Sequence, residues 1–211
     1  MPPRDEQDYE ERRQQIINGA LEAFAAKGFD SASTKDIAEA AKIGSPGLIY
    51  HYFKDKVDLL HQVILHRMAM IEVMDTAEKM MDLPPEQALP EMARKLLGAL
   101  HEWPTVAIAR VVFAESMRNK QVAHMVSDIG PGRGMRIMAT YLERQMDAGR
   151  LRRMNPHIAA RMLIGPIIAY ALTSYIFEQP EIQSVAPEEM AQQTIEGFLR
   201  AMRPDGEALT R

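Results

Sequence analysis

The segment from Thr34 to Leu60, TKDIAEAAKIGSPGLIYHYFKDKVDLL, constrains how this chain can fold more than any other. It contains two short stretches with helical spacing, and Ile37 and Ala41 lie on one face of the first. Only Lys42 to Gly44 separate the two stretches, which is room for a tight turn and nothing more. We therefore predict two short helices that meet at a sharp angle, a helix-turn-helix.

Residues that cap helices stand at the start of both stretches. Ser33 or Thr34 can accept hydrogen bonds from the free N–H groups at the start of the first helix. Ser45 precedes Pro46, and a hydroxyl cap followed by a proline in the first helical position is a common way for a helix to begin. The second helix is therefore expected to start at these two residues.

The second helix has an inward and an outward side. Ile49 and Phe53, four residues apart, would anchor it to a core and leave the tyrosines and the histidine between them exposed. A helix that reads DNA needs a buried anchor and an exposed edge. Tyrosine hydroxyls and the lysines that follow suit phosphate oxygens. The candidate DNA contacts are Thr34, Lys35, Gly44, Ser45, Pro46, Gly47, Leu48, Tyr50, His51, Tyr52, Lys54 and Lys56.

This segment resembles the DNA-binding domain of the TetR family of transcriptional regulators, whose pattern is roughly T-x-x-x-I-A-x-x-A-G-V-S-x-x-x-L-Y-x-Y-F-x-x-K-x-x-L. In two places the chain departs from that pattern: Lys42 replaces the usual glycine, and the stretch from Gly44 to Leu48 is one residue longer. The direct matches are Thr34, Ile37, Ala38, Ala41, Ile43, Ile49, Tyr50, Tyr52, Phe53, Lys56 and Leu59.

The net charge of the N-terminal segment does not by itself indicate DNA binding. Residues 1–60 carry 8 basic and 11 acidic residues, a net charge of −3. Net charge governs the long-range attraction of a protein to DNA, whereas direct contact with DNA requires only a local group of basic residues. We therefore give the motif more weight than the net charge.

The rest of the chain also has helical spacing, and no segment reads as a strand. We expect further helices at about 10–27, 57–81, 86–102, 104–118, 131–148, 156–178 and 187–202. The resulting order of about nine helices resembles the whole TetR architecture. We therefore predict an all-α fold with a three-helix DNA-binding domain at residues 1–56. A helical domain for ligand binding and dimerisation would occupy residues 57–211.

The segment from Ile158 to Phe177 is apolar enough to be considered as a membrane span. Arg161 and the break at Gly165-Pro166 argue against lipid, so we expect no membrane association. Together with the last helix it would form half of a four-helix homodimer interface, so that two DNA-reading helices meet a pseudo-palindromic operator. The candidate dimer contacts are Leu163, Ile167, Tyr170, Ile195, Phe198 and Leu199.

Sixteen methionines are unusual for this length. They fit either gap-filling in a helical core or an adaptable apolar ligand cavity, and the two interpretations overlap. The family resemblance implies a pocket for a small effector. The candidate ligand contacts are His101, Trp103, Arg110, Phe113, Met117, Met138 and Tyr141.

Enzymatic function is not expected. The chain lacks a G-x-S-x-G motif, a phosphate-binding glycine loop and any cysteine, and His61 and His66 lack the glutamate of a zinc-protease motif. We expect no cofactor and no metal. The polar N-terminal segment and the absence of cysteine favour the cytoplasm.

The sequence thus predicts a TetR-like repressor that binds operator DNA as a dimer and is released by a small, largely apolar effector. The alternative is a helical interaction or small-molecule-binding protein that has lost sequence-specific DNA binding.

Overall fold

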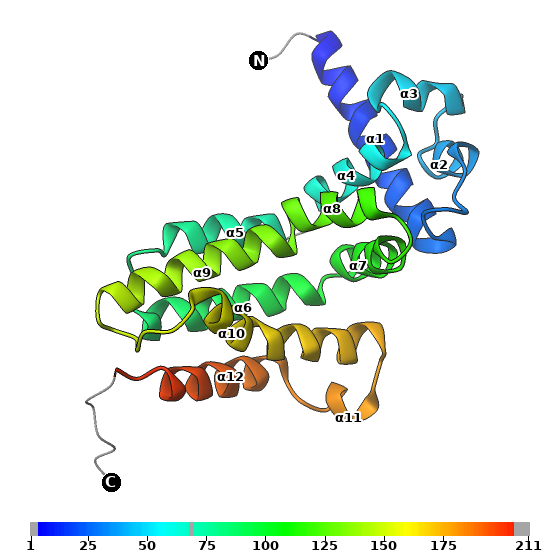
Figure 1. The fold of residues 1–211 in the computed structure, drawn as a ribbon. Helices are drawn as coiled ribbons and strands as arrows, with labels where there is room; N and C mark the ends of the chain where they lie inside the picture. The colour runs from blue at the N-terminus through cyan, green and yellow to red at the C-terminus, as the bar shows by residue number, and fades with distance from the viewer. Residues whose placement is uncertain (1–3, 68–69, 205–211) are drawn as a thin grey trace. The chain divides into compact units, whose positions relative to one another are not determined.

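A computed structural model describes residues 4–67 and 70–204 of the protein (Figure 1). These residues form helices and connecting turns without a strand, which confirms the predicted all-α class. By packing, the helices divide into two compact units.

The first unit contains the predicted helix-turn-helix. Its elements are α1 (Arg4–Lys27), α2 (Thr34–Ala40), the 3-10 turn η1 (Pro46–Leu48), α3 (Ile49–Tyr52), α4 (Lys56–Arg67), α7 (Trp103–Ser116) and α8 (Lys120–Ile129).

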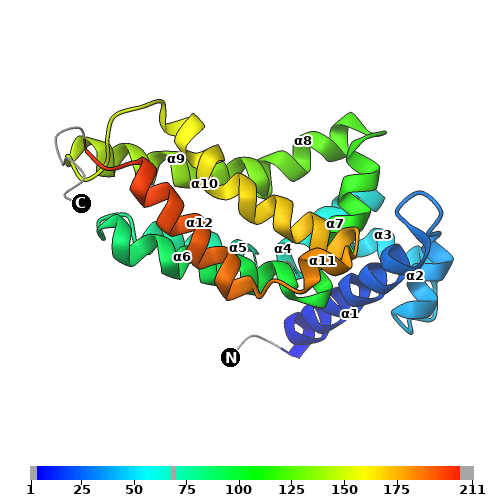
Figure 2. The same ribbon diagram turned by 90° about the horizontal axis from the view of Figure 1, so that it is seen from below.

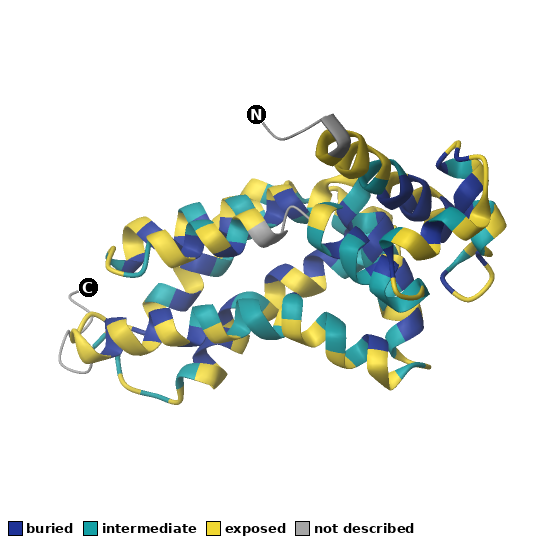
Figure 3. Cartoon of the chain, turned by 90° about the horizontal axis from the view of Figure 1, so that it is seen from above, coloured by how far each residue is buried: buried dark blue, intermediate teal, exposed yellow. Residues whose placement is uncertain are grey.

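Helix α1 is the centre of this unit. Its residues 16–24 are mostly buried, and residues 6–12 before them are exposed (Figure 3). Ile16, Ile17 and Phe24 are at most 1% exposed and belong to a core shared with α2, α4 and α7. Gly19 lies where α1 passes close to the end of α2, because a Cβ atom there would fall 2.4 Å from the backbone nitrogen of Ala41. The position of α2 on α1 therefore depends on this glycine.

The second unit is a separate helical bundle. Its elements are α5 (Met70–Lys79), α6 (Pro85–His101), α9 (Pro131–Asp147), α10 (Pro156–Ala171), the π-helical segment η2 (Leu172–Ile176), α11 (Pro180–Gln183) and α12 (Pro187–Ala201).

Within this second unit, α12 lies beside α6 and α10 (Figure 2). Tyr141 and Leu142 of α9 are completely buried in its core. Arg152 fastens the end of α12, since its backbone N–H donates to the Met202 carbonyl at 2.9 Å and its guanidinium to the Ala201 carbonyl at 2.8 Å.

Several predicted boundaries differ from the structure. The helix predicted for 57–81 corresponds to α4 in the first unit and α5 in the second, with Met68 and Ala69 between them outside the described residues. Helix α8 was not predicted, although Val122, Met125, Val126 and Ile129 have helical spacing. The compact units also differ from the division at residue 56, because α4, α7 and α8 pack with the first helices. The functional division remains a prediction.

In the described part of the chain, one helical stretch, Pro156–Ile176, is long and apolar enough by length and composition to cross a membrane. Its α10 portion packs against α6, α9 and α12 of the second unit. Core helices of proteins that never enter a membrane share these properties.

Candidate nucleic-acid interface

Helix α2 begins with a complete capping box. The Ser33 hydroxyl accepts from the Asp36 N–H at 3.2 Å, and the Asp36 carboxylate accepts from the Ser33 N–H at 2.8 Å. Of the two predicted caps, Ser33 is therefore the one used. The Lys27 ammonium donates to Asp36 at 2.6 Å, and this bond, with those from Ser33, holds the pKa of the Asp36 carboxyl well below its usual range.

The turn after α2 is a Schellman motif. The Ile43 N–H donates to the Ala38 carbonyl and the Lys42 N–H to the Glu39 carbonyl, each at 3.0 Å. In this motif the residue at the position of Lys42 has a left-handed backbone, and its φ is +53°. Glycine adopts this conformation without strain, which explains in physical terms why the family pattern has a glycine at the position of Lys42.

The second helix starts at Pro46, as predicted, but not with the predicted cap. The Ser45 side chain makes no capping hydrogen bond, and the helical segment opens as the 3-10 turn η1 before α3 begins at Ile49. Ile49 and Phe53 are each 2% exposed, which confirms them as the anchors. Helix α3 ends at Tyr52, and Phe53 is already extended.

The candidate DNA contacts lie at the start of α2, along the turn, η1 and α3, and between α3 and the start of α4, and they differ in exposure. Tyr50 is 59% exposed. Thr34, Leu48, Tyr52 and Lys56 are half-buried. The other candidates, all exposed, are Lys35, Gly44, Ser45, Pro46, Gly47, His51 and Lys54. The structure thus leaves free most of the surface that the sequence predicted to face DNA.

The two candidate lysines after α3 have different surroundings. The Lys54 side chain is exposed, while its N–H donates to the Asp58 carboxylate at 2.9 Å. The Lys56 ammonium donates to the Asp30 carbonyl at 3.1 Å and lies 4.7 Å from the centre of the Phe29 ring. Burial lowers the pKa of Lys56. Lys56 therefore fastens α4 to the loop after α1, and Lys54 is the better placed of the two for a phosphate.

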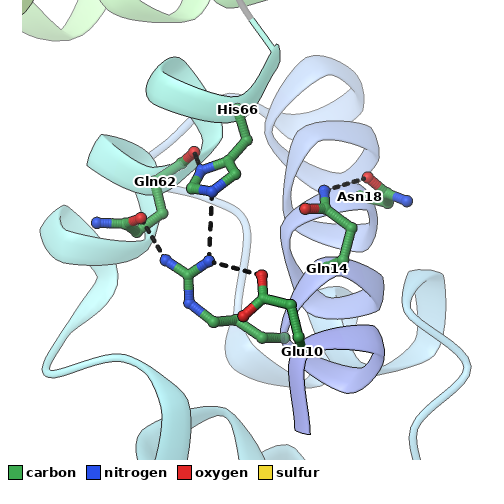
Figure 4. A network of polar contacts seen from close by, with 6 residues as sticks. Glu10, Gln14, Asn18, Gln62 and His66 are labelled. Carbon is green, nitrogen blue, oxygen red and sulfur yellow. Dashed lines mark hydrogen bonds and ion pairs between the residues drawn. The ribbon is translucent and has the colours of Figure 1, made fainter. Parts of the chain in front are cut away.

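Two side chains of α1 that the sequence did not single out contact the end of α3. The Tyr9 ring lies 4.6 Å from the Tyr52 ring, centre to centre, and the Arg13 guanidinium lies 5.6 Å from the centre of the Phe53 ring. Arg13 also bonds to Gln62 and lies 3.3 Å from both Glu10 and the His66 ring; Figure 4 shows these partners on α1 and α4.

The candidate ligand contacts fall in both units. Trp103 and Phe113 on α7 are 61% and 53% exposed, Met117 directly after it is 74% exposed, and Arg110 is also exposed.

The other three candidate ligand contacts lie in the second unit. The exposed His101 has its ring 5.2 Å from that of Tyr175. Met138 is half-buried. Tyr141 is completely buried and donates to the Leu83 carbonyl at 3.0 Å, so it serves the core of this unit.

The candidate dimer contacts are mostly internal. Leu199 is half-buried, and the five buried ones are Leu163, Ile167, Tyr170, Ile195 and Phe198. These five side chains belong to the core of the second unit, and buried side chains offer little surface to another copy. The dimer interface remains a prediction, and the exposed large apolar residues of α10 are Ile158, Met162 and Ile168.

A short helix anchored by Ile49 and Phe53, following a capped helix and a tight turn, defines a helix-turn-helix DNA-binding protein. Family models agree with this class. Residues 16–63 match the model of bacterial regulatory proteins of the tetR family, and residues 87–204 match the C-terminal domain of AefR-like transcriptional repressors.

Known proteins resemble the chain over most of its length. The HTH-type transcriptional regulator UidR of Escherichia coli K12 is 31% identical over 153 residues, 71% of this chain and 72% of UidR. The chain belongs to the TetR family of transcriptional regulators.

Solved structures share the fold. A complex of SmeT with triclosan superposes with a TM-score of 0.75 at 22% identity, covering 92% of this chain and 93% of SmeT. FadR from Bacillus subtilis in complex with stearoyl-CoA gives a TM-score of 0.73 at 18% identity, covering 90% of this chain and 99% of FadR.

Proposed function

We propose that the protein is a ligand-responsive repressor in the cytoplasm that binds a pseudo-palindromic operator through η1 and α3. The observation that carries the proposal is the exposed surface formed by residues Gly44 to Gly47, Tyr50, His51 and Lys54, on and beside a short helix whose anchors Ile49 and Phe53 are buried. Lys54 and the Tyr50 hydroxyl suit phosphate oxygens, and the exposed edge of α3 suits base edges in the major groove.

We further propose that the protein acts as a homodimer. An operator that contains two half-sites is read by two copies related by a two-fold axis. The exposed apolar side chains Ile158, Met162 and Ile168 on α10 support this proposal, because they form a surface that a second copy would cover.

The proposed effector is small and largely apolar. This proposal is supported by the exposed aromatic and methionine side chains on and after α7, Trp103, Phe113 and Met117, whose burial against a ligand would be favourable. Triclosan and stearoyl-CoA, bound to SmeT and FadR, both carry large apolar parts.

The DNA-binding part is tested by selecting genomic fragments on the purified protein and measuring their affinity by gel shift. Tyr50→Ala should lower that affinity by roughly 5- to 150-fold, as expected from the loss of one contact worth about 1 to 3 kcal/mol. Gln121→Ala, an exposed change on α8, is the control and should bind like the wild type.

Salt dependence separates this proposal from the alternative protein without DNA binding. Phosphate contacts make affinity fall steeply with salt, and Lys54→Ala should reduce the slope of log affinity against log salt by about 1. A wild-type protein that selects no fragment and binds random duplex without salt dependence would favour the alternative.

The effector is tested by adding a panel of small apolar compounds to the protein–DNA complex. A true effector should both raise the melting temperature of the free protein and release the DNA, because it favours one of two conformations. A compound that stabilises the protein and leaves DNA affinity unchanged would contradict ligand-responsive repression.

A further inference from the structure

The DNA-reading helix α3 is too short to hold its own position. It spans only Ile49–Tyr52 and is closed at its end by the bond from the Phe53 N–H to the Ile49 carbonyl at 3.0 Å. A single helical turn is unstable in isolation, because forming it fixes several backbone angles for few hydrogen bonds. The direction of α3 therefore depends on the side chains that tie it to its neighbours.

Ile49 and Phe53 supply two of these ties, and both face the core. The third is at the half-buried Tyr52, whose ring meets that of Tyr9 at 4.6 Å with an interplanar angle of 31°. This is a close, tilted aromatic contact of the favourable kind. It joins the end of α3 to an otherwise exposed part of α1, since Tyr9 itself remains 48% exposed.

The same face of α1 supports the next residue of the reading head. Arg13 lies four residues after Tyr9, so both side chains lie on one side of the helix. The Arg13 guanidinium lies against Phe53, and its bond to Gln62 ties it to α4. Tyr9 and Arg13 thus hold two consecutive residues, Tyr52 and Phe53, at the point where α3 ends.

We infer that Tyr9 is a positioning residue for DNA recognition, acting through its ring contact with Tyr52. The inference rests on the proposed DNA binding by α3. With the ring contact present, Tyr50 and Lys54, which flank Tyr52 on either side, meet DNA in a fixed arrangement. Without the ring contact, the end of α3 is less constrained. DNA binding must then order this segment, and the lost conformational entropy lowers the affinity.

Tyr9→Phe and Tyr9→Ala separate a positioning role from a direct contact. A ring contact needs no hydroxyl, so Tyr9→Phe should bind selected DNA within about 2-fold of the wild type, whereas Tyr9→Ala should lose about 3- to 10-fold. The matched control is the exposed neighbour Gln7→Ala, which should change nothing. Equal losses in Tyr9→Phe and Tyr9→Ala would overturn the inference in favour of a hydroxyl contact with DNA. Unchanged affinity in Tyr9→Ala would overturn it outright.

A double-mutant cycle tests the partner. Once Tyr52 is replaced by alanine, Tyr9→Ala should cause little further loss of affinity, because the two rings act as one unit. Additive losses would contradict action through Tyr52.

A second measurement needs no DNA. In protein with labelled tyrosine rings, the NMR signals of the Tyr52 ring should move in Tyr9→Ala and stay near their wild-type positions in Gln7→Ala. Circular dichroism should show that all variants keep the wild-type helix content. If the wild type selects no DNA, the proposed function fails, while the Tyr52 signals still decide whether the contact exists. Unmoved Tyr52 signals in Tyr9→Ala would refute the contact itself.

Discussion

Lys42 adopts a backbone conformation that costs free energy for every residue except glycine. Its φ of +53° is required by the Schellman motif that ends α2, and left-handed geometry costs a side-chain-bearing residue about 1 kcal/mol. Lys42→Gly should therefore raise the free energy of unfolding by up to about 1 kcal/mol, less the entropy that glycine adds to the unfolded chain. Urea denaturation measures this change.

A second lysine provides the control for Lys42. Lys35 is also exposed but lies in the first turn of α2, where glycine is less favourable than lysine, so Lys35→Gly should lower the free energy of unfolding by up to about 1 kcal/mol. Destabilisation by both substitutions would show that the strain at Lys42 is not significant.

The carboxylate of Asp36 makes a pH-dependent contribution to the free energy of unfolding. Hydrogen bonds from Lys27 and Ser33 lower the pKa of its carboxyl in the folded state. A carboxyl with a lowered folded pKa stabilises the fold at pH values above its unfolded pKa of about 3.9, and this contribution is lost as the pH falls toward the folded pKa. Asp36→Asn should therefore lower the free energy of unfolding at pH 7. It should also make that free energy fall less steeply between about pH 5 and pH 3 than it does in the wild type.

Urea denaturation across this pH range, with Asp8→Asn as a control on an exposed carboxyl of α1, tests the assignment. The same slope in Asp36→Asn and the wild type would mean that other groups control the acid response.

At the scale of elements, the contact between α1 and α2 depends on the absence of a side chain at Gly19. A Cβ atom there would meet the backbone nitrogen, Cα and Cβ of Ala41 at 2.4 to 2.6 Å, and backbone cannot move aside as a flexible side chain can. Gly19→Ala should lower the free energy of unfolding by about 1 to 3 kcal/mol, the usual cost of overpacking.

Gly98 provides the matched control within helix α6. A Cβ atom there meets nothing within 4 Å, so Gly98→Ala should raise the free energy of unfolding by about 0.5 to 1 kcal/mol. Thermal unfolding of both variants measures the contrast. A Gly19→Ala protein as stable as Gly98→Ala would mean that the two helices are not held this closely.

The elements that the sequence predicted well are those marked by local chemistry. Ser33 with Asp36 begins α2, and Ile49 with Phe53 sets the inner side of α3, because each pair lies within one helical turn. The contact between Tyr9 and Tyr52 could not be predicted in this way, since its partners are far apart in the chain.

Helix α10 shows a different limit on prediction. Its apolar residues surround the helix, so no polar stripe tells which side faces inward. The sequence correctly predicted that the helix is apolar. It gave Leu163, Ile167 and Tyr170 as dimer contacts, and the structure places these three side chains in the core of the second unit.

At the scale of the whole molecule, composition and helix order were sufficient to predict the fold class. They were not sufficient to predict which helices form each compact unit. Helices α7 and α8 follow α6 in the chain yet pack with α1 and α4. Packing between helices that are distant in the chain depends on which apolar faces fit together. Helical spacing identifies the apolar face of each helix but not the helix that packs against it.

Assembly is the remaining property at this scale, and the exposed side of α10 provides its test. Ile158 and Met162, one turn apart, are 53% and 42% exposed within a single chain. If a second copy covers them, glutamate at both positions would bury two charges without partners, a cost that a dimer interface does not tolerate. The double variant Ile158→Glu, Met162→Glu should therefore sediment as a monomer at concentrations where the wild type is a dimer.

The same variant should also lose operator affinity by at least about 10-fold, because two linked DNA-reading heads bind far more tightly than one. Leu83→Glu is the control, since Leu83 is an apolar residue of the same unit with a similar exposure of 40% but lies outside α10. A double variant that stays dimeric and retains its affinity would place the interface on another surface. A variant that is monomeric but binds operator normally would separate dimerisation from DNA recognition, and a pseudo-palindromic operator would then no longer be required.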